Sequence, residues 1–366
     1  MDTQPPKARS VDRLSWLDWT RGLGAVIMLQ GHCYHSFTRP ELRNSSTWVL
    51  SQFVGGMPPA IFLFLTGVTL AFLMDSTARK GLPPRERVLA ALRRSGYLFA
   101  LAFAFRIQMW IFALPNNPLS DIFKVDVLNC MGLGIALLAL LSMLSTHDRI
   151  RFSAGVGIAI AAASPLVSAI DWSGVPWVVK SYLAPDWVTF PLFPWAAFMA
   201  FGVSFGSIVR VAPQELSNRM MEWTALAGFG LVVGARYFAS LPYSLYTNSQ
   251  FWLDSPALTF IKLGVILLMM SFAFLWTTYV VKDSWSWVSQ LGTTSLLVYW
   301  VHTELVYGRW VWFWKDNLSI PAATAVSVAV IVLMVALSTL KTRWSDVRAW
   351  WRARNRPPAA ASAPVE

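Results

Sequence analysis

Residues 17–37 read LDWTRGLGAVIMLQGHCYHSF, a predominantly apolar run that carries a few polar side chains. A helix of about 20 mostly apolar residues is long enough to cross the hydrocarbon core of a bilayer. The polar residues of this run include Asp18, Arg21, His32 and His35. Ionisable groups inside a membrane are costly, so each of them is a candidate functional residue. The run therefore predicts a transmembrane helix that also contains functional residues.

The composition of the whole chain agrees with a membrane protein. Of its 366 residues, 55% are hydrophobic and only 13% are charged, whereas soluble domains carry about 25% charged residues. A soluble globule would expose such long apolar runs to water. We therefore predict an all-α integral membrane protein, a bundle of about ten transmembrane helices. The predicted spans are 17–37, 48–74, 90–114, 125–145, 152–170, 188–209, 222–240, 256–281, 288–308 and 320–340.

Basic residues predict the orientation of this bundle. The net charge is +11, and about two thirds of the Lys and Arg residues fall on the side of the N-terminus, which the positive-inside rule assigns to the cytoplasm. Both termini are thus expected inside, and the basic loops indicate topology rather than nucleic-acid binding. We predict a cytoplasmic N-terminal segment (1–16), a transmembrane domain (17–340) and a basic, partly disordered cytoplasmic tail (341–366). The expected location is the bacterial cytoplasmic membrane.

Three of the four histidines are expected at similar depth. His32 lies about 15 residues into the first span and His302 about 14 residues into the ninth, which runs the same way, so both reach roughly 22 Å from the cytoplasmic side. His35 is one turn beyond His32, and Tyr299 is one turn before His302. Each histidine can be a hydrogen-bonded packing residue, but their convergence favours a site near the outer face.

Four further charged residues are candidates for binding a substrate. Asp18 and Arg21 are spaced to pair across one helical turn, and Arg21 shares a helix face with His32 about 16 Å away. Arg106 in the third span and Arg236 in the seventh reach depths comparable with those of the histidines. The alternatives are a salt bridge at the helix end for the first pair and snorkelling to the interface for the other two.

The R-x(10)-H spacing from Arg21 to His32 resembles the signature of membrane acyltransferases that modify cell-surface glycans. The longer run RLSWLDWTRGLGAVIMLQGH (13–32) is more similar to a neighbouring family, which shares the catalytic domain of heparan-alpha-glucosaminide N-acetyltransferase. Four later segments resemble that family in order: PPAIFLFLTGVTLAF (58–72), KVDVLNCMGLG (124–134), FPLFPWAAFMAFGVSFG (190–206) and LGTTSLLVYWVHTELV (291–306). The similarity covers about residues 11–340.

The resemblance implies an acyltransferase that uses cytosolic acyl-CoA, with acetyl-CoA as the expected co-substrate and no metal. The acceptor is a hydroxyl or amine of a glycan or small molecule on the outer side. We assign the catalytic roles to His32, His302 and His35. Donor-binding and oxyanion-stabilising roles are assigned to Arg21, Asp18, Arg106, Tyr299 and Arg236, with further cations from the basic loop 79–94. Direct transfer and an acyl-histidine intermediate both stay open, as does a homodimer.

One departure from the family affects the catalytic assignment. In the lysosomal member, the residue regarded as catalytic lies in the luminal stretch after the first helix, but the corresponding FTRPELRNSSTW (37–48) contains no His. The role of His32 is therefore carried over from the R-x(10)-H branch. A secondary transporter or lipid-linked glycan flippase is the main alternative, although such proteins often show two related halves and none is visible here. A non-catalytic scaffold would not retain so many intramembrane polar residues.

Overall fold

The computed structural model describes residues 14–115, 118–344 and 348. Within these residues every regular element is helical, apart from an isolated bridge between Thr38 and Leu318. The α-helices are α1 (Ser15–Phe37), α2 (Ser46–Gly55), α3 (Pro58–Arg79), α4 (Pro84–Phe112), α5 (Val127–Leu138), α6 (Thr146–Ser168), α7 (Trp177–Leu183), α8 (Leu192–Val211), α9 (Ser217–Ala239), α10 (Pro256–Leu275), α11 (Trp287–Thr293), α12 (Ser295–Tyr307) and α13 (Ile320–Thr342).

Local sequence accounts for where several of these helices begin. Pro58, Pro84 and Pro256 stand at the first turn of α3, α4 and α10, where a residue without an N–H loses no helical hydrogen bond. Asp126 caps α5, because its Oδ1 accepts hydrogen bonds from the backbone N–H of Leu128 and Asn129. The Asn129 side chain accepts in turn from the Asp126 N–H at 3.1 Å, which completes a capping box.

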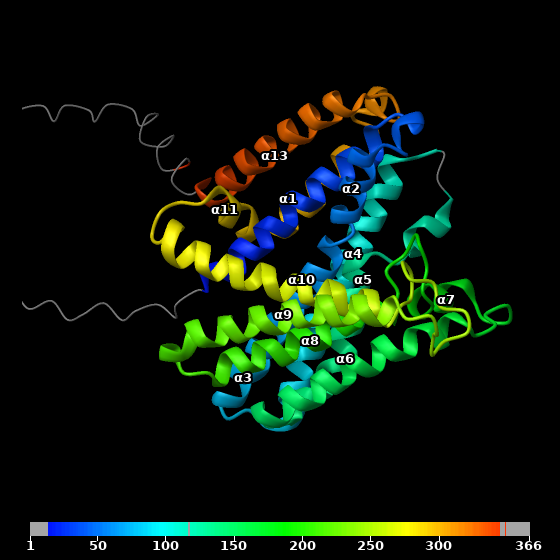
Figure 1. The fold of residues 1–366 in the computed structure, drawn as a ribbon. Coiled ribbons are helices and arrows are strands. Elements are labelled where there is room, and N and C mark those ends of the chain that lie inside the picture. Colours follow the sequence, from blue (N-terminus) through cyan, green and yellow to red (C-terminus); the bar gives the residue numbers. More distant parts are fainter. Residues whose placement is uncertain (1–13, 116–117, 345–347, 349–366) are drawn as a thin grey trace, which may run out of the picture.

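The helix α1 runs through the middle of the bundle and contacts α2, α3, α10, α11, α12 and α13. The start of α1 and the end of α13 lie at the same end of the molecule, at the left in Figure 1. We call this the terminal end. The end of α1 and the start of α13 meet at the opposite end, where the Arg39 N–H donates to Leu318 O at 3.0 Å.

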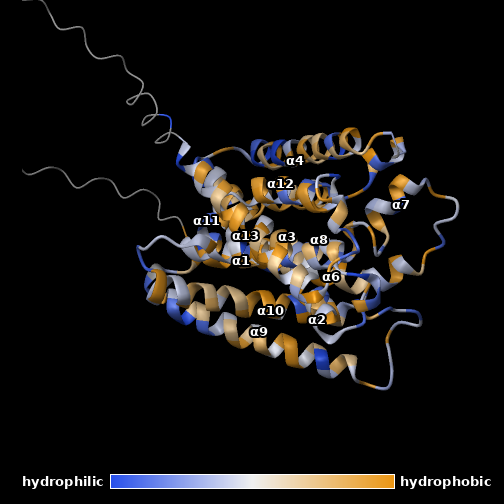
Figure 2. Ribbon diagram, turned by 90° about the horizontal axis from the view of Figure 1, so that it is seen from above, coloured by the Kyte–Doolittle hydropathy of each residue, from blue (hydrophilic) through white to orange (hydrophobic). Residues whose placement is uncertain are grey.

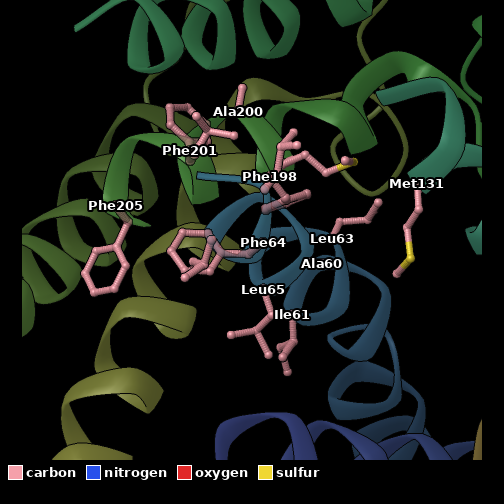
Figure 3. Close-up of a cluster of buried hydrophobic side chains, with 14 of the residues drawn as sticks. Ala60, Ile61, Leu63, Phe64, Leu65, Met131, Phe198, Ala200, Phe201 and Phe205 are labelled. Carbon is pink, nitrogen blue, oxygen red and sulfur yellow. The ribbon is translucent and has the colours of Figure 1, made fainter. Parts of the chain in front are cut away.

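The apolar core lies where α3 packs on α8 and α8 packs on α6. Phe64, Phe198 and Phe201 interlock there, as Figure 3 shows. The backbones of α3 and α8 approach closely at two glycines. A Cβ on Gly67 would lie 2.0 Å from Met199 O, and a Cβ on Gly202 would lie 2.0 Å from Phe64 O. Small residues at membrane helix crossings allow such approach.

The outer surface of the bundle carries many apolar side chains, and Figure 2 shows hydrophobic residues along the long helices, densely on α10 and interrupted by hydrophilic residues on α4 and α9. Large apolar side chains such as Leu226 and Phe229 on α9 are exposed. Six of the described helices are long and apolar enough to cross a membrane: 46–79, 84–112, 146–168, 192–211, 256–281 and 320–342. Water would be a poor solvent for such a surface, so the protein is an integral membrane protein.

The predicted spans agree with the helices except at two places. The span predicted at 48–74 falls within the candidate span 46–79, in which a break at Gly56 and Met57, just before two prolines, separates α2 from α3. The span predicted at 288–308 divides into α11 and α12 at Thr294. Ten spans and the N-in orientation stay predictions. The predicted terminal segments, 1–16 and 341–366, lie mostly outside the described residues.

Replacing Gly202 with Ala tests the crossing of α3 and α8. The added methyl group would meet the Phe64 carbonyl, so we expect a loss of roughly 1–3 kcal/mol from overpacking and a lower melting temperature in detergent. Gly96 in α4 is the matched control, because a Cβ there meets nothing within 4 Å. Ala at that position should keep or raise the melting temperature, since Ala favours helix over Gly. Equal effects of the two substitutions would contradict this packing.

Candidate active site

Two histidines far apart in the sequence meet inside the bundle. His32 Nδ1 on α1 lies 2.9 Å from His302 Nε2 on α12. The two rings stack with their centroids 5.1 Å apart and their planes at 21°. His302 is fully buried, whereas His32 is only partly buried. The structure thus brings together the two histidines that the sequence placed at similar depth.

A backbone carbonyl assigns the protons of this pair. His302 Nδ1 lies 2.6 Å from Val298 O, and a carbonyl oxygen can only accept, so this nitrogen carries the proton. A neutral imidazole has a single N–H, which makes His302 Nε2 the acceptor for the N–H of His32 Nδ1. His32 Nε2 then keeps its lone pair. This chain of hydrogen bonds orients a base in the way that a third group orients the histidine of a catalytic triad.

Two tyrosines of α12 flank the histidine pair. The Tyr299 ring contacts His302 at a centroid distance of 6.1 Å. The Tyr307 ring contacts His32 at 5.2 Å and His35 at 6.4 Å. His35 is exposed one turn beyond His32, so it lies beside Tyr307 rather than in the hydrogen-bonded pair.

A cavity of about 510 Å³ extends from the terminal end toward this pair. We call it the terminal cavity. Arg21, Arg94 and Lys341 line it together with apolar residues of α3, α4 and α5, and Tyr299 is part of its wall. Because Tyr299 also contacts His302, the cavity reaches within one side chain of the histidine pair. A cationic rim and an apolar interior suit an anionic molecule with a long apolar arm.

The break between α11 and α12 contributes backbone to the same cavity. The first turn of α12, from Ser295 to Leu297, lines it next to Thr294. The first N–H groups of a helix have no partner within the helix, and the helix dipole adds positive potential there. This helix start therefore adds N–H donors to the cations of Arg21 and Arg94. The sequence signal for the break is the polar stretch Thr293–Ser295 inside an apolar run.

A second cavity of about 350 Å³ lies on the other side of the histidine pair. We call it the opposite cavity. Tyr307 lines it, and so do Glu304, Arg106, Arg309 and several aromatic residues. The Tyr307 ring contacts His32, so this cavity also reaches within one side chain of the pair. The lining mixes charges with aromatic surface, which suits a polar ligand with an apolar face.

Aromatic rings pack where α4 meets α12, next to Tyr299 of the terminal cavity and Arg106 of the opposite cavity, and we call this packing the aromatic partition. Phe105 packs against Tyr299 and Trp300, with ring centroids 5.4 Å and 5.1 Å apart. The Trp300 Nε1–H donates to Gln108 Oε1 at 2.7 Å, which links the helices again one turn later. Neither His32 nor His302 is among the described residues that line these two cavities. The histidine pair thus lies behind Tyr299 on one side and behind Tyr307 on the other.

The charged candidates from the sequence fall into different places. Arg21 Nη1 pairs with Asp18 Oδ1 at 3.1 Å beside the terminal cavity. Arg106 Nε lies 3.2 Å from Asp126 Oδ2, so this arginine is anchored to the carboxylate that caps α5. Of the basic loop, Arg94 lines the cavity, whereas Arg79 pairs with Asp75.

Arg236 is the one candidate that the structure does not bring to the site. Its side chain is exposed in the last turn of α9. That helix packs mainly on α10 at the edge of the bundle and lines neither cavity. Counting residues gave the depth of Arg236 along its helix, but it did not say which helices are neighbours. The sequence analysis also missed Tyr307 and Glu304, although both lie on the same helix as His302 and within six residues of it.

Comparison with known proteins adds one match. The family model described as heparan-alpha-glucosaminide N-acetyltransferase, catalytic, matches residues 13–247. This range includes α1 with Arg21 and His32, and it ends before α12 with His302. No curated protein matches the chain.

Thiol labelling tests the separation of the two cavities. Tyr299→Cys should react with a membrane-impermeant maleimide added to one face of the membrane, and Tyr307→Cys should react only from the other face. The native Cys33 and Cys130 are buried and free, so the unsubstituted protein is the control and should stay unlabelled. Labelling of both variants from the same face would contradict the partition.

Proposed function

The chain belongs to the heparan-alpha-glucosaminide N-acetyltransferase catalytic family, and on this premise we propose that it transfers an acetyl group from acetyl-CoA to a hydroxyl or amine of a glycan or related acceptor. The observation that supports this proposal most directly is the pair of cavities on the two sides of His32 and His302. An enzyme whose two substrates arrive from opposite faces of a membrane needs such an arrangement. The acyl group is then the only part of the donor that has to pass the histidine pair from one cavity to the other.

We further propose that the terminal end faces the cytoplasm and that ten spans cross the bacterial cytoplasmic membrane. The basic residues support this orientation through the positive-inside rule. The cations of the terminal cavity agree with it, because acetyl-CoA is a cytosolic anion. The acceptor then enters the opposite cavity from the outer side.

In this proposal the phosphates of acetyl-CoA bind at the mouth of the terminal cavity. Arg21, Arg94 and Lys341 supply charge, and the N-terminus of α12 supplies backbone donors. The pantetheine arm extends past Leu98 and Met131, which line the apolar interior. The thioester then lies beside Tyr299, one ring away from His302.

His32 is the proposed general base. Its Nε2 removes the proton of the acceptor hydroxyl or amine, while the Nδ1–H stays hydrogen-bonded to His302. The acceptor atom bonds to the acetyl carbon, the C–S bond breaks, and the proton passes to the CoA thiolate. In the alternative route His32 Nε2 attacks the thioester carbon, the C–S bond breaks and CoA leaves as its thiolate. The acceptor then attacks the acetyl carbon, the bond to Nε2 breaks, and the proton of the acceptor passes to the thiolate. Both routes require the Tyr299 or Tyr307 ring to rotate, because these rings separate the imidazoles from the cavities.

Replacing His32 with Ala should separate catalysis from donor binding. We expect turnover to fall by about 100-fold to 10,000-fold, the usual contribution of a positioned base. The affinity for acetyl-CoA should change little, because the cations of the terminal cavity remain. His147 is exposed on α6, and His147→Ala is the matched control that should keep full turnover. An active His32→Ala enzyme would move the catalytic role to His35 or His302.

Replacing Arg21 with Ala should weaken the binding of acetyl-CoA and leave the base, His32, in place. A charge-assisted hydrogen bond to phosphate contributes roughly 1.5–3 kcal/mol, which corresponds to about tenfold to a hundredfold in the dissociation constant of CoA. Arg236→Ala removes an exposed arginine far from the cavity and should leave CoA affinity unchanged.

The competing role of Arg21 is to pair with Asp18 and stabilise the start of α1. In that case Arg21→Ala and Asp18→Asn would both lower the melting temperature, and neither would change CoA affinity. Measuring CoA binding and melting temperature on the same samples distinguishes the two roles.

A further inference from the structure

A carboxylate without a charged partner lies in the wall of the opposite cavity. Glu304 on α12 is only 7% exposed. Its Oε1 accepts a hydrogen bond from Trp310 Nε1 at 3.3 Å. Its Oε2 is buried and accepts no hydrogen bond within 3.5 Å from the described residues, although the Gln108 side chain lies close to the carboxylate. Burying an acceptor without a partner is unfavourable, and this cost is larger for a charged group.

The Glu304 carboxylate packs closely against the backbone of Gly308. A Cβ on Gly308 would lie 2.7 Å from Glu304 Oε1 and 2.1 Å from the Glu304 carbonyl oxygen, so only glycine fits there without a shift. Lys315 Nζ donates to Tyr307 O at 2.7 Å, and its charge acts on Glu304 only from beyond ion-pair distance. No ion pair within 4.0 Å joins Glu304 to a cation of the described chain. The Oε2 atom therefore keeps the capacity to accept a hydrogen bond from a molecule in the cavity.

The rest of the cavity wall indicates what that molecule is. Trp110 and Trp312 provide aromatic surface, and Arg309 and Lys315 provide donors. Aromatic rings contact the C–H face of a sugar, carboxylates accept from its hydroxyls, and cationic groups donate to its oxygens. A cationic amine is a poorer fit, because Arg106, Lys124, Arg309 and Lys315 together outnumber the carboxylates of Asp121 and Glu304 in this wall.

We propose that Glu304 is an acceptor-binding residue, whose Oε2 accepts a hydrogen bond from a hydroxyl of a carbohydrate in the opposite cavity. This inference rests on the proposed function, because it places the acceptor of the acetyl group in that cavity. Glu304 lies one turn before Tyr307 on α12, and the Tyr307 ring contacts His32. A sugar held by Glu304 therefore presents a neighbouring hydroxyl or amine toward the base.

The test compares Glu304→Gln with Glu222→Gln, a matched change at an exposed position of α9. Glutamine keeps the shape of the side chain and removes the charge that makes the hydrogen bond strong. The probes are glucose, glucosamine and glucuronate at millimolar concentration, observed by saturation-transfer NMR on the purified protein in detergent. We expect saturation transfer to the ring protons of the bound sugar with the unsubstituted protein and with Glu222→Gln. With Glu304→Gln we expect the affinity for the same sugar to be weaker by tenfold or more. No sugar signal with the unsubstituted protein, or equal signals with both variants, would overturn the proposal.

The melting temperature distinguishes binding from a structural role. Because Glu304 Oε2 accepts no hydrogen bond within 3.5 Å from the described residues, Glu304→Gln should keep or raise the melting temperature of the protein without sugar. A fall of several degrees would instead assign Glu304 to the fold through its bond to Trp310. Acetyl-CoA affinity should be unchanged in Glu304→Gln. If the unsubstituted protein binds sugar but not acetyl-CoA, the proposed function fails, and what stands is the contact of Glu304 with a carbohydrate.

Discussion

The hydrogen-bond chain from Val298 through His302 to His32 is the interaction on which the site depends. In the apolar interior of a membrane protein a polar group without a partner is costly, so buried imidazoles are held where partners exist. A single carbonyl oxygen fixes the tautomer of His302, and His302 fixes that of His32. The same helix α1 packs closely on α11, where a Cβ on Gly22 would lie 1.8 Å from Val288 O. The hydrogen bonds of the two imidazoles leave His32 Nε2 as the nitrogen with a free lone pair, which is the atom that the proposed function uses as a base.

In the proposed function, the two cavities extend this arrangement into a route for an acyl group. Each cavity ends at a tyrosine that touches one histidine of the pair, Tyr299 on one side and Tyr307 on the other. The contacts of Phe105 with Tyr299 and Trp300 keep the cavities apart. Such a partition lets a small group pass while the large donor stays on its own side. It would hinder a transporter, which has to move its whole substrate.

Much of the fold was predictable from the sequence, because long apolar runs have few alternatives to membrane helices. The equal depth of His32 and His302 was also predictable, since two parallel spans carry them, and the structure adds that these two helices are neighbours. Lateral neighbours were not predictable from depth alone. Arg236 lies on an edge helix, and the role of the α12 start in the terminal cavity depends on a helix break at Thr294. Glu304 was missed because an unpartnered oxygen is a property of the surroundings and not of the residue type.

The central claim is that the acetyl group crosses the membrane while CoA does not. Proteoliposomes with glycan extract enclosed and labelled acetyl-CoA added outside test it most directly. For molecules with the terminal end outward, we expect label to accumulate on the enclosed glycans while free CoA appears only outside. Label confined to acceptors on the same side as acetyl-CoA, or no transfer at all with protein that binds acetyl-CoA, would contradict the account.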